Sequence, residues 1–191
     1  MAGKITYYCL CLVAMCIWSC TKTPDTLNKI TLHTMENTAF TFNEVEKHTV
    51  SVITFFSPDC PLSENYTKNL NDLQTEYANQ DVLFISVVPG KFYSNQAIDS
   101  FRVLYRLQGM LLIDRDKILT DYLGATITPE TFVLDSTAAV RYSGAIDNWA
   151  VDLGQKREVI TKFYLHDAIE ATLHDNAVVV THADAVGCYI E

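Results

Sequence analysis

Glycine and proline are scarce in this sequence of 191 residues, which contains 7 glycines and 5 prolines. Such a chain is neither collagen-like nor dominated by linkers. Basic residues are also few, because 14 lysines and arginines face 23 aspartates and glutamates, for a formal net charge of −9. A surface of that sign repels phosphate backbones, so nucleic acid is not an expected partner.

Glycine-rich phosphate loops are absent as well. Neither G-x-G-x-x-G nor G-K-[ST] follows any predicted strand, which weakens the case for a doubly wound nucleotide-binding fold. Hydrophobic residues make up 49% of the chain and charged residues 19%. This composition is sufficient for one domain with a sizeable core and excludes wholesale disorder.

The first twenty residues have the shape of an export signal. Lys4 precedes an uncharged apolar stretch, residues 5–18, which is too short to span a bilayer comfortably. The stretch ends at Ile17-Trp18-Ser19-Cys20, which resembles a bacterial lipobox except that Trp18 is bulky. The resemblance implies cleavage before Cys20 and acylation of that cysteine, and several acyl chains anchor a protein firmly to a membrane. The alternative is simple cleavage nearby, which would leave a soluble secreted protein.

We therefore expect a signal peptide over residues 1–19, a lipidated tether over 20–29, a folded domain over 30–175 and a tail over 176–191. The expected location is the bacterial cell envelope, lipid-anchored on the periplasmic side or at the cell surface. After cleavage and lipidation of Cys20, the remaining thiols are those of Cys60 and Cys188. In an oxidising compartment such a pair can form a disulfide, cycle through one or act separately.

Strand-like and helix-like segments alternate from residue 30 onwards. Residues 50–56 and 82–88 are β-branched and aromatic, as central strands buried on both faces are, and right-handed crossovers make them parallel neighbours. Between them, apolar residues at three- and four-residue steps predict an amphipathic helix over residues 61–80. Further strands are expected at residues 30–35, 39–42, 110–114, 131–135 and 139–143, and further helices at residues 95–107, 118–123 and 155–173. This alternation indicates an α/β domain.

Cys60 lies where a predicted strand gives way to a helix, in the run Ser57-Pro58-Asp59-Cys60-Pro61-Leu62-Ser63. The first turn of a helix offers unpaired N–H groups and the positive end of the helix dipole, and both stabilise a thiolate. Asp59 opposes this effect, since a neighbouring carboxylate disfavours a second negative charge. We expect a nucleophilic Cys60 that is not extremely acidic. The alternative is a buried cysteine that acts only as a small hydrophobic residue.

Two motifs carry a resemblance to a known family, namely Cys60-Pro61-Leu62-Ser63-Glu64-Asn65-Tyr66 and Thr128-Pro129-Glu130-Thr131-Phe132-Val133-Leu134-Asp135. With them the chain resembles the thioredoxin superfamily, in particular the redoxins of the alkyl hydroperoxide reductase and thiol-specific antioxidant family. The resemblance implies a thioredoxin-like α/β fold, with a central mixed sheet flanked by helices, an N-terminal β-hairpin and a C-terminal tail. It also implies that Pro129 is a cis-proline beside the nucleophile, where an extended substrate can pair with the backbone. The alternative is an ordinary trans turn.

The sequence departs from the patterns of that superfamily at two places. Ser63 stands where thioredoxin-type reductases have a second cysteine, so internal release of a mixed disulfide needs a thiol from elsewhere. Ile53 stands where peroxiredoxins have the proline of P-x-x-x-[ST]-x-x-C, which favours disulfide exchange over peroxide reduction. Cys188 is the candidate resolving cysteine. A static Cys60–Cys188 bridge and pairing of Cys188 with another chain are the alternatives.

We expect an exported thiol-disulfide oxidoreductase or thiol-dependent antioxidant that acts on protein thiols or small oxidants and is recharged by a reducing thiol partner. Cys60 is the nucleophile, and Ser57 or Ser63 donates a hydrogen bond to its thiolate. This chemistry requires no metal or organic cofactor. The alternative is a redoxin-fold envelope lipoprotein that binds a partner without turnover.

Overall fold

The computed structural model describes residues 26–191. The strands are β1 (Thr31–Thr34), β2 (Ala39–Thr41), β3 (Val50–Phe55), β4 (Val82–Pro89), β5 (Met110–Asp114), β6 (Ile127–Thr128), β7 (Glu130–Asp135), β8 (Val140–Gly144), β9 (Ala150–Asp152), β10 (Gln155–Lys156), β11 (His182–Ala183) and β12 (Cys188–Tyr189). The α-helices are α1 (Pro61–Glu76), α2 (Asn95–Leu104), α3 (Ile118–Leu123) and α4 (Tyr164–Leu173), and 3-10 helices cover Leu27–Lys29 and Phe42–Lys47. No helix within residues 26–191 is long and apolar enough to cross a membrane.

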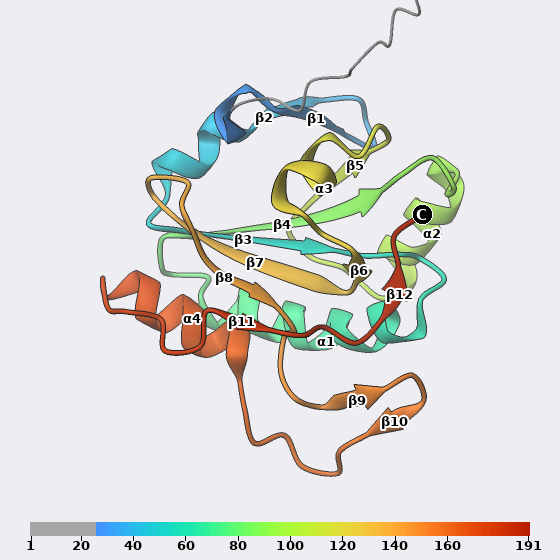
Figure 1. The fold of residues 1–191 in the computed structure, drawn as a ribbon. Coiled ribbons are helices and arrows are strands. Elements are labelled where there is room, and N and C mark those ends of the chain that lie inside the picture. Colours follow the sequence, from blue (N-terminus) through green and yellow to red (C-terminus); the bar gives the residue numbers. More distant parts are fainter. Residues whose placement is uncertain (1–25) are drawn as a thin grey trace, which may run out of the picture.

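The main sheet has eight strands in the order β11-β8-β7-β3-β4-β5-β1-β2, with helices against it (Figure 1). Strands β1 and β2 form the predicted N-terminal hairpin, and β3 and β4 are parallel neighbours, as predicted. The central mixed sheet flanked by helices is therefore confirmed. The predicted signal peptide over residues 1–19, Cys20 and the tether up to residue 25 lie outside the described residues.

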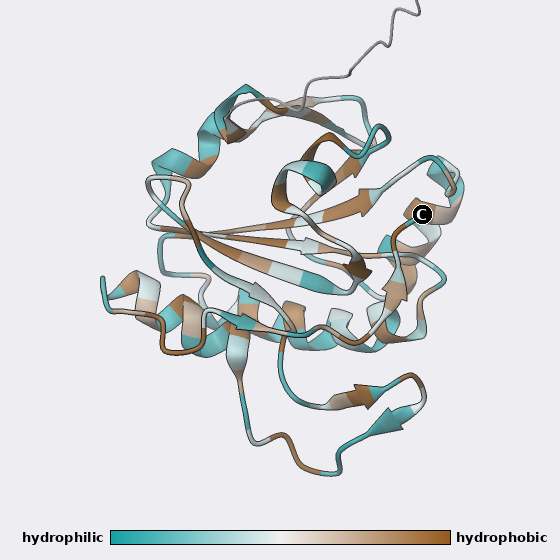
Figure 2. Ribbon diagram, in the orientation of Figure 1, coloured by the Kyte–Doolittle hydropathy of each residue, from teal (hydrophilic) through white to brown (hydrophobic). Residues whose placement is uncertain are grey.

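Strand β3 is the centre of the core because both of its faces are covered and all of its residues are buried. Val52 lies opposite Phe84 of β4 on one side and Val133 of β7 on the other. Alternate β3 residues enter two separate hydrophobic clusters, Val52 with the apolar faces of α1, α2 and α4, and Ile53 with α3 and the N-terminal segments. Hydrophobic residues accordingly gather along the central strands (Figure 2). The carboxyl end of this rigid strand leads directly to Cys60.

The predicted helix over residues 155–173 is wrong in its first half, because α4 begins only at Tyr164. The side chain of Asn148 accepts hydrogen bonds from the N–H groups of Thr161 and Lys162, at 3.0 and 3.2 Å, and so holds this segment in a non-helical form. Val159 and Phe163 continue the apolar spacing of α4, but they are 68% and 50% exposed. Their spacing therefore does not reflect a buried helix face. The helices predicted over residues 61–80 and 95–107 are also shorter, ending at Glu76 and Leu104.

The tail of residues 176–191 lies along the domain and runs from α4 past α1 to β12 (Figure 1). Strand β11 pairs in parallel with β8, and Gly144 permits the close approach, since a Cβ there would lie 1.8 Å from the carbonyl oxygen of Ala183. Strand β12 then pairs antiparallel with β6. Hydrogen bonds therefore fix the tail at β11, in its middle, and again at β12, and they determine where Cys188 lies.

We predict that Asp147→Ala destabilises the domain by about 3 kcal/mol. Asp147 is buried and accepts hydrogen bonds from Tyr66, Asn69 and the N–H of Trp149, at 2.7, 3.1 and 2.8 Å. Removing the carboxylate leaves buried donors without an acceptor, which costs about 1–3 kcal/mol for each such group. Urea unfolding measures the change, with the exposed Asp152→Ala as control. Equal unfolding free energies for the two variants would contradict the prediction.

Candidate active site

Cys60 is the residue immediately before helix α1, and the local sequence fixes it there. Strand β3 ends at Phe55, and in the turn that follows the Cys60 N–H donates to the carbonyl of Ser57 at 3.1 Å. Pro61 then begins the helix, where its missing N–H leaves no unsatisfied donor. The Cys60 carbonyl accepts a helical hydrogen bond from the N–H of Glu64 at 3.0 Å. The Cys60 side chain therefore lies beside the free N–H groups of the first turn.

The sulfur of Cys60 is buried, yet its neighbours are polar. The residue is 0% exposed, and as a thiol it donates to the carbonyl of Thr128, with Sγ and the oxygen 3.1 Å apart. Burial raises the pKa of Cys60, but hydrogen bonds from the side chain of Cys188 and from the N–H groups of Ser63 and Leu62 outweigh it, and the pKa is lowered. The interpretation of Cys60 as a small hydrophobic residue does not fit these contacts.

Cys188 reaches Cys60 from the C-terminal tail. Its strand β12 places Cys188 opposite Thr128 of β6. Burial, the hydrogen bond to Cys60 and the negative charges of Cys60 and Asp59 raise the pKa of Cys188 to about 12. Both cysteines are free in this structure. The Cys60 sulfur therefore accepts a hydrogen bond from Cys188, which is the less acidic of the two thiols.

The peptide bond between Thr128 and Pro129 is cis, as the family resemblance implies. The loop before Pro129 contacts Cys60 through the carbonyl of Thr128, whose hydroxyl also donates to Ser57 Oγ at 2.9 Å. The backbone of β6 beside this proline is where an extended substrate was expected to pair. Strand β12 of the chain itself pairs there.

Ser63, rather than Ser57, has its hydroxyl at the sulfur. A hydrogen bond from the Ser63 side chain contributes to the lowered pKa of Cys60, and Ser63 Oγ also accepts the Ser57 N–H at 3.2 Å. The Ser57 hydroxyl is instead bonded to Thr128. The structure thus brings Ser57, Ser63, Pro129 and Cys188 around Cys60, and hydrogen bonds from Ser63 and Cys188 are among the causes that lower its pKa.

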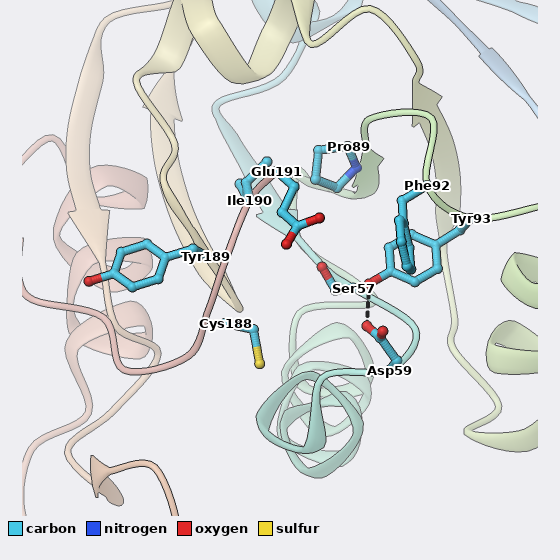
Figure 3. A pocket seen from close by; sticks show the side chains of 9 residues that line it. All are labelled: Ser57, Asp59, Pro89, Phe92, Tyr93, Cys188, Tyr189, Ile190 and Glu191. Atoms are coloured by element: carbon cyan, nitrogen blue, oxygen red, sulfur yellow. Dashed lines mark hydrogen bonds between the residues drawn. The ribbon is translucent and has the colours of Figure 1, made fainter.

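A pocket of about 200 Å³ opens beside Cys188 (Figure 3). Asp59 accepts a hydrogen bond from the hydroxyl of Tyr93 on one side of it, and Cys188 lies on the other side. Burial and the hydrogen bond to Asp59 raise the pKa of Tyr93, so its hydroxyl keeps its proton. Tyr93 and Glu191 line the pocket but were not predicted, because no local pattern indicates that their distant segments meet Cys188.

Metal binding has no support in the described part of the chain. No group of three His, Cys, Asp or Glu side chains in residues 26–191 is arranged to hold a metal ion. The polar groups around Cys60 are hydroxyls, backbone groups and a second sulfur. What this arrangement can do without further ligands is thiol chemistry.

A family model for AhpC/TSA proteins matches residues 23–143, which is more than half of the chain. The chain belongs to the AhpC/TSA family. Cys60 and Pro129 lie within the matched residues, whereas Cys188 lies beyond them. No curated protein matches the sequence significantly.

Solved structures show that the fold of this AhpC/TSA family member is thioredoxin-like. A hypothetical protein from Sinorhizobium meliloti 1021 is 22% identical, with a TM-score of 0.75 over 86% of this chain and 93% of that one. An uncharacterised conserved protein from Geobacillus kaustophilus is 18% identical, with a TM-score of 0.74 over 90% and 93% of the two chains. A secreted Mycobacterium tuberculosis disulfide oxidoreductase, homologous to Escherichia coli DsbE, is 18% identical, with a TM-score of 0.54 over 61% and 84%.

We predict that Cys188→Ala raises the pKa of Cys60. The variant removes an S–H donor, and a hydrogen bond to a charged group contributes about 1.5–3 kcal/mol. The thiolate fraction of Cys60 at neutral pH should therefore fall. The pH dependence of Cys60 alkylation by iodoacetamide, measured on its tryptic peptide, gives this pKa.

Cys188→Ser is the matched control, because serine keeps a donor at the same place. Its Cys60 pKa should lie closer to that of the unmodified chain than to that of Cys188→Ala. Identical Cys60 pKa values in all three proteins would show that the contact with Cys188 does not stabilise the thiolate.

Proposed function

We propose that this chain is an exported thiol-disulfide oxidoreductase or thiol-dependent antioxidant of the bacterial cell envelope, with Cys60 as its nucleophile. The observation that carries this proposal is the contact between Cys60, lowered in pKa at the start of α1, and the protonated thiol of Cys188. A reactive thiolate next to a second thiol is the arrangement that disulfide exchange requires. Membership of the AhpC/TSA family supports thiol redox chemistry in general.

The reaction transfers two electrons from the cysteine pair to a disulfide substrate. The Cys60 thiolate attacks one sulfur of the substrate R–S–S–R, and the S–S bond breaks to give a mixed disulfide and RS⁻. The thiol of Cys188 then loses its proton and attacks Cys60, which forms the Cys60–Cys188 disulfide and releases the second RS⁻. A reducing thiol partner returns both sulfurs to the starting state. Cys188 thereby takes the role of the second cysteine of thioredoxin-type reductases, whose position in this chain is held by Ser63.

The neighbouring residues have supporting roles in this proposal. Ser63 donates a hydrogen bond to the Cys60 thiolate, and Ser57 holds the hydroxyl of Thr128. Pro129 shapes the loop that presents the Thr128 carbonyl to the sulfur. Disulfide exchange is favoured over peroxide reduction, because Ile53 replaces the proline of the peroxiredoxin pattern.

Export and lipid anchoring form the second part of the proposal. The apolar stretch of residues 5–18 and the following Cys20 support cleavage and lipidation. The similar M. tuberculosis structure is of a secreted disulfide oxidoreductase, which is compatible with a location of this chain outside the cytoplasm. The body of the protein, with its net negative charge, then relies on the anchor for membrane attachment.

We predict that the chain catalyses reduction of a small disulfide by an added thiol, and that Cys60→Ser lowers the rate at least 100-fold. In these assays the four cysteines before residue 21 are replaced by serine, so that Cys60 and Cys188 are the thiols measured. In the absence of the added thiol, Cys188→Ser should accumulate the mixed disulfide on Cys60, because no second thiol remains to release it. The exposed Ser136→Ala is the control and should retain full activity.

The alternative function, a binding module without turnover, makes a different prediction for the same assay. If the chain with both Cys60 and Cys188 reduces the small disulfide no faster than an equal concentration of free cysteine does, the oxidoreductase proposal fails and the binding module is favoured.

A further inference from the structure

Strand β12 occupies the free edge of β6 immediately before Pro129. Cys188 lies opposite Thr128 and Tyr189 lies opposite Ile127. The pairing continues beyond β12, because the N–H of Ile190 donates to the carbonyl of Thr126 at 2.9 Å. An extended polypeptide that needs these backbone groups therefore finds them already bonded.

The fit between the tail and β6 is too close for any side chain at residue 187. A Cβ on Gly187 would lie 2.1 Å from the carbonyl oxygen of Thr128 and 2.7 Å from Cγ2 of Ile127. Such distances are far below van der Waals contact, and the nearer atom belongs to the backbone. Glycine at this position is thus what allows β12 to lie against β6.

The docked tail also controls access to Cys60. Cys60 is 0% exposed, and Cys188 forms a side-chain hydrogen bond with it. The sulfur of Cys188 points from β12 toward the helix seen end-on in Figure 3, which is α1. The way in beside this sulfur is the pocket of about 200 Å³ between the tail and the Asp59–Tyr93 pair. A small molecule that enters this pocket reaches Cys188, whereas a polypeptide that pairs with β6 must first displace β12.

We propose that β12 acts as a built-in substrate strand on β6, so that the resting enzyme exchanges with small disulfides and admits polypeptide disulfides only when the tail leaves β6. This inference rests on the proposed function and narrows its substrate class. Cys188 occupies the position on β12 that the disulfide cysteine of a polypeptide substrate would occupy if that polypeptide paired with β6. The tail lies beyond the residues that match the family model, so this selectivity is carried by a segment outside that match.

The two cysteines alone supply the two electrons that reduce the small disulfide substrate. The Cys60 thiolate forms a bond to one sulfur of R–S–S–R, and RS⁻ leaves. Attack by Cys188 then forms the internal disulfide, and its proton passes to solvent as the second RS⁻ leaves. The substrate disulfide is reduced by two electrons and the cysteine pair is oxidised by two.

The test compares two probes that release the same chromophore, 4-thiopyridone. One is cysteamine carrying an S-thiopyridyl group, and the other is a ten-residue extended peptide whose single cysteine carries the same group. Each rate is divided by the rate of the same probe with free cysteine, which removes intrinsic reactivity. The pre-reduced chain, with its four N-terminal cysteines replaced by serine, should favour the small probe at least tenfold.

Gly187→Ala should abolish that preference by displacing β12 and raising the rate with the peptide at least tenfold. Ile190→Ser is a second variant, because Ile190 packs against the hydrophobic cluster beside β6 and anchors the same strand. Val179→Ala changes a tail residue that is 96% exposed and should behave as the unmodified chain does.

Equal normalised rates for both probes in the unmodified chain would overturn the inference, as would a preference that neither Gly187→Ala nor Ile190→Ser reduces. If instead the chain reacts with the small probe no faster than free cysteine does, the proposed oxidoreductase function itself fails. The two failures are therefore distinguishable.

Discussion

The contact between the sulfurs of Cys60 and Cys188 is the interaction on which the site depends. A thiolate that is fully buried needs hydrogen-bond donors to offset the loss of solvation. Helix α1 supplies two N–H groups, Ser63 a hydroxyl and Cys188 its S–H. Without the fourth donor the same sulfur would be a poorer thiolate and would have no partner for internal release.

This contact is produced by three parts of the chain that lie far apart in the sequence. The turn after β3 fixes Cys60 at the start of α1, and β7, paired with β3, brings the Thr128–Pro129 loop to the same edge. The tail then pairs with β6 and adds Cys188. In thioredoxin-type reductases both sulfurs come from one helix turn. Here the second sulfur comes from a strand, so any event that moves the tail also changes the chemistry of Cys60.

Much of the fold was predictable from local pattern. The β-branched runs at β3 and β4 and the apolar spacing of α1 identify the centre of the domain, because burial on both faces leaves a strong signal. Pro61 after Cys60 marks the start of the helix, which placed the candidate nucleophile correctly at the helix start. The cis bond at Pro129 followed only from family resemblance, since an isolated Thr-Pro does not require it.

The parts that could not be predicted depend on long-range contacts. The late start of α4 is caused by Asn148, whose side chain binds backbone groups more than ten residues away. The docking of the tail depends on the absence of a side chain at Gly187, which leaves no periodic pattern in the sequence. The pairing of Tyr93 with Asp59 likewise joins residues on separate loops.

The central claim, that Cys60 and Cys188 are redox partners within one folded chain, is tested most directly by peptide mapping after controlled oxidation. The chain is treated with one equivalent of a small disulfide, the remaining thiols are blocked, and the unreduced digest is analysed by mass spectrometry. The account predicts a linked Cys60–Cys188 peptide from monomeric protein, which added thiol converts back to two separate peptides. Oxidised protein in which these two cysteines remain unlinked, or are linked only between chains, would contradict it.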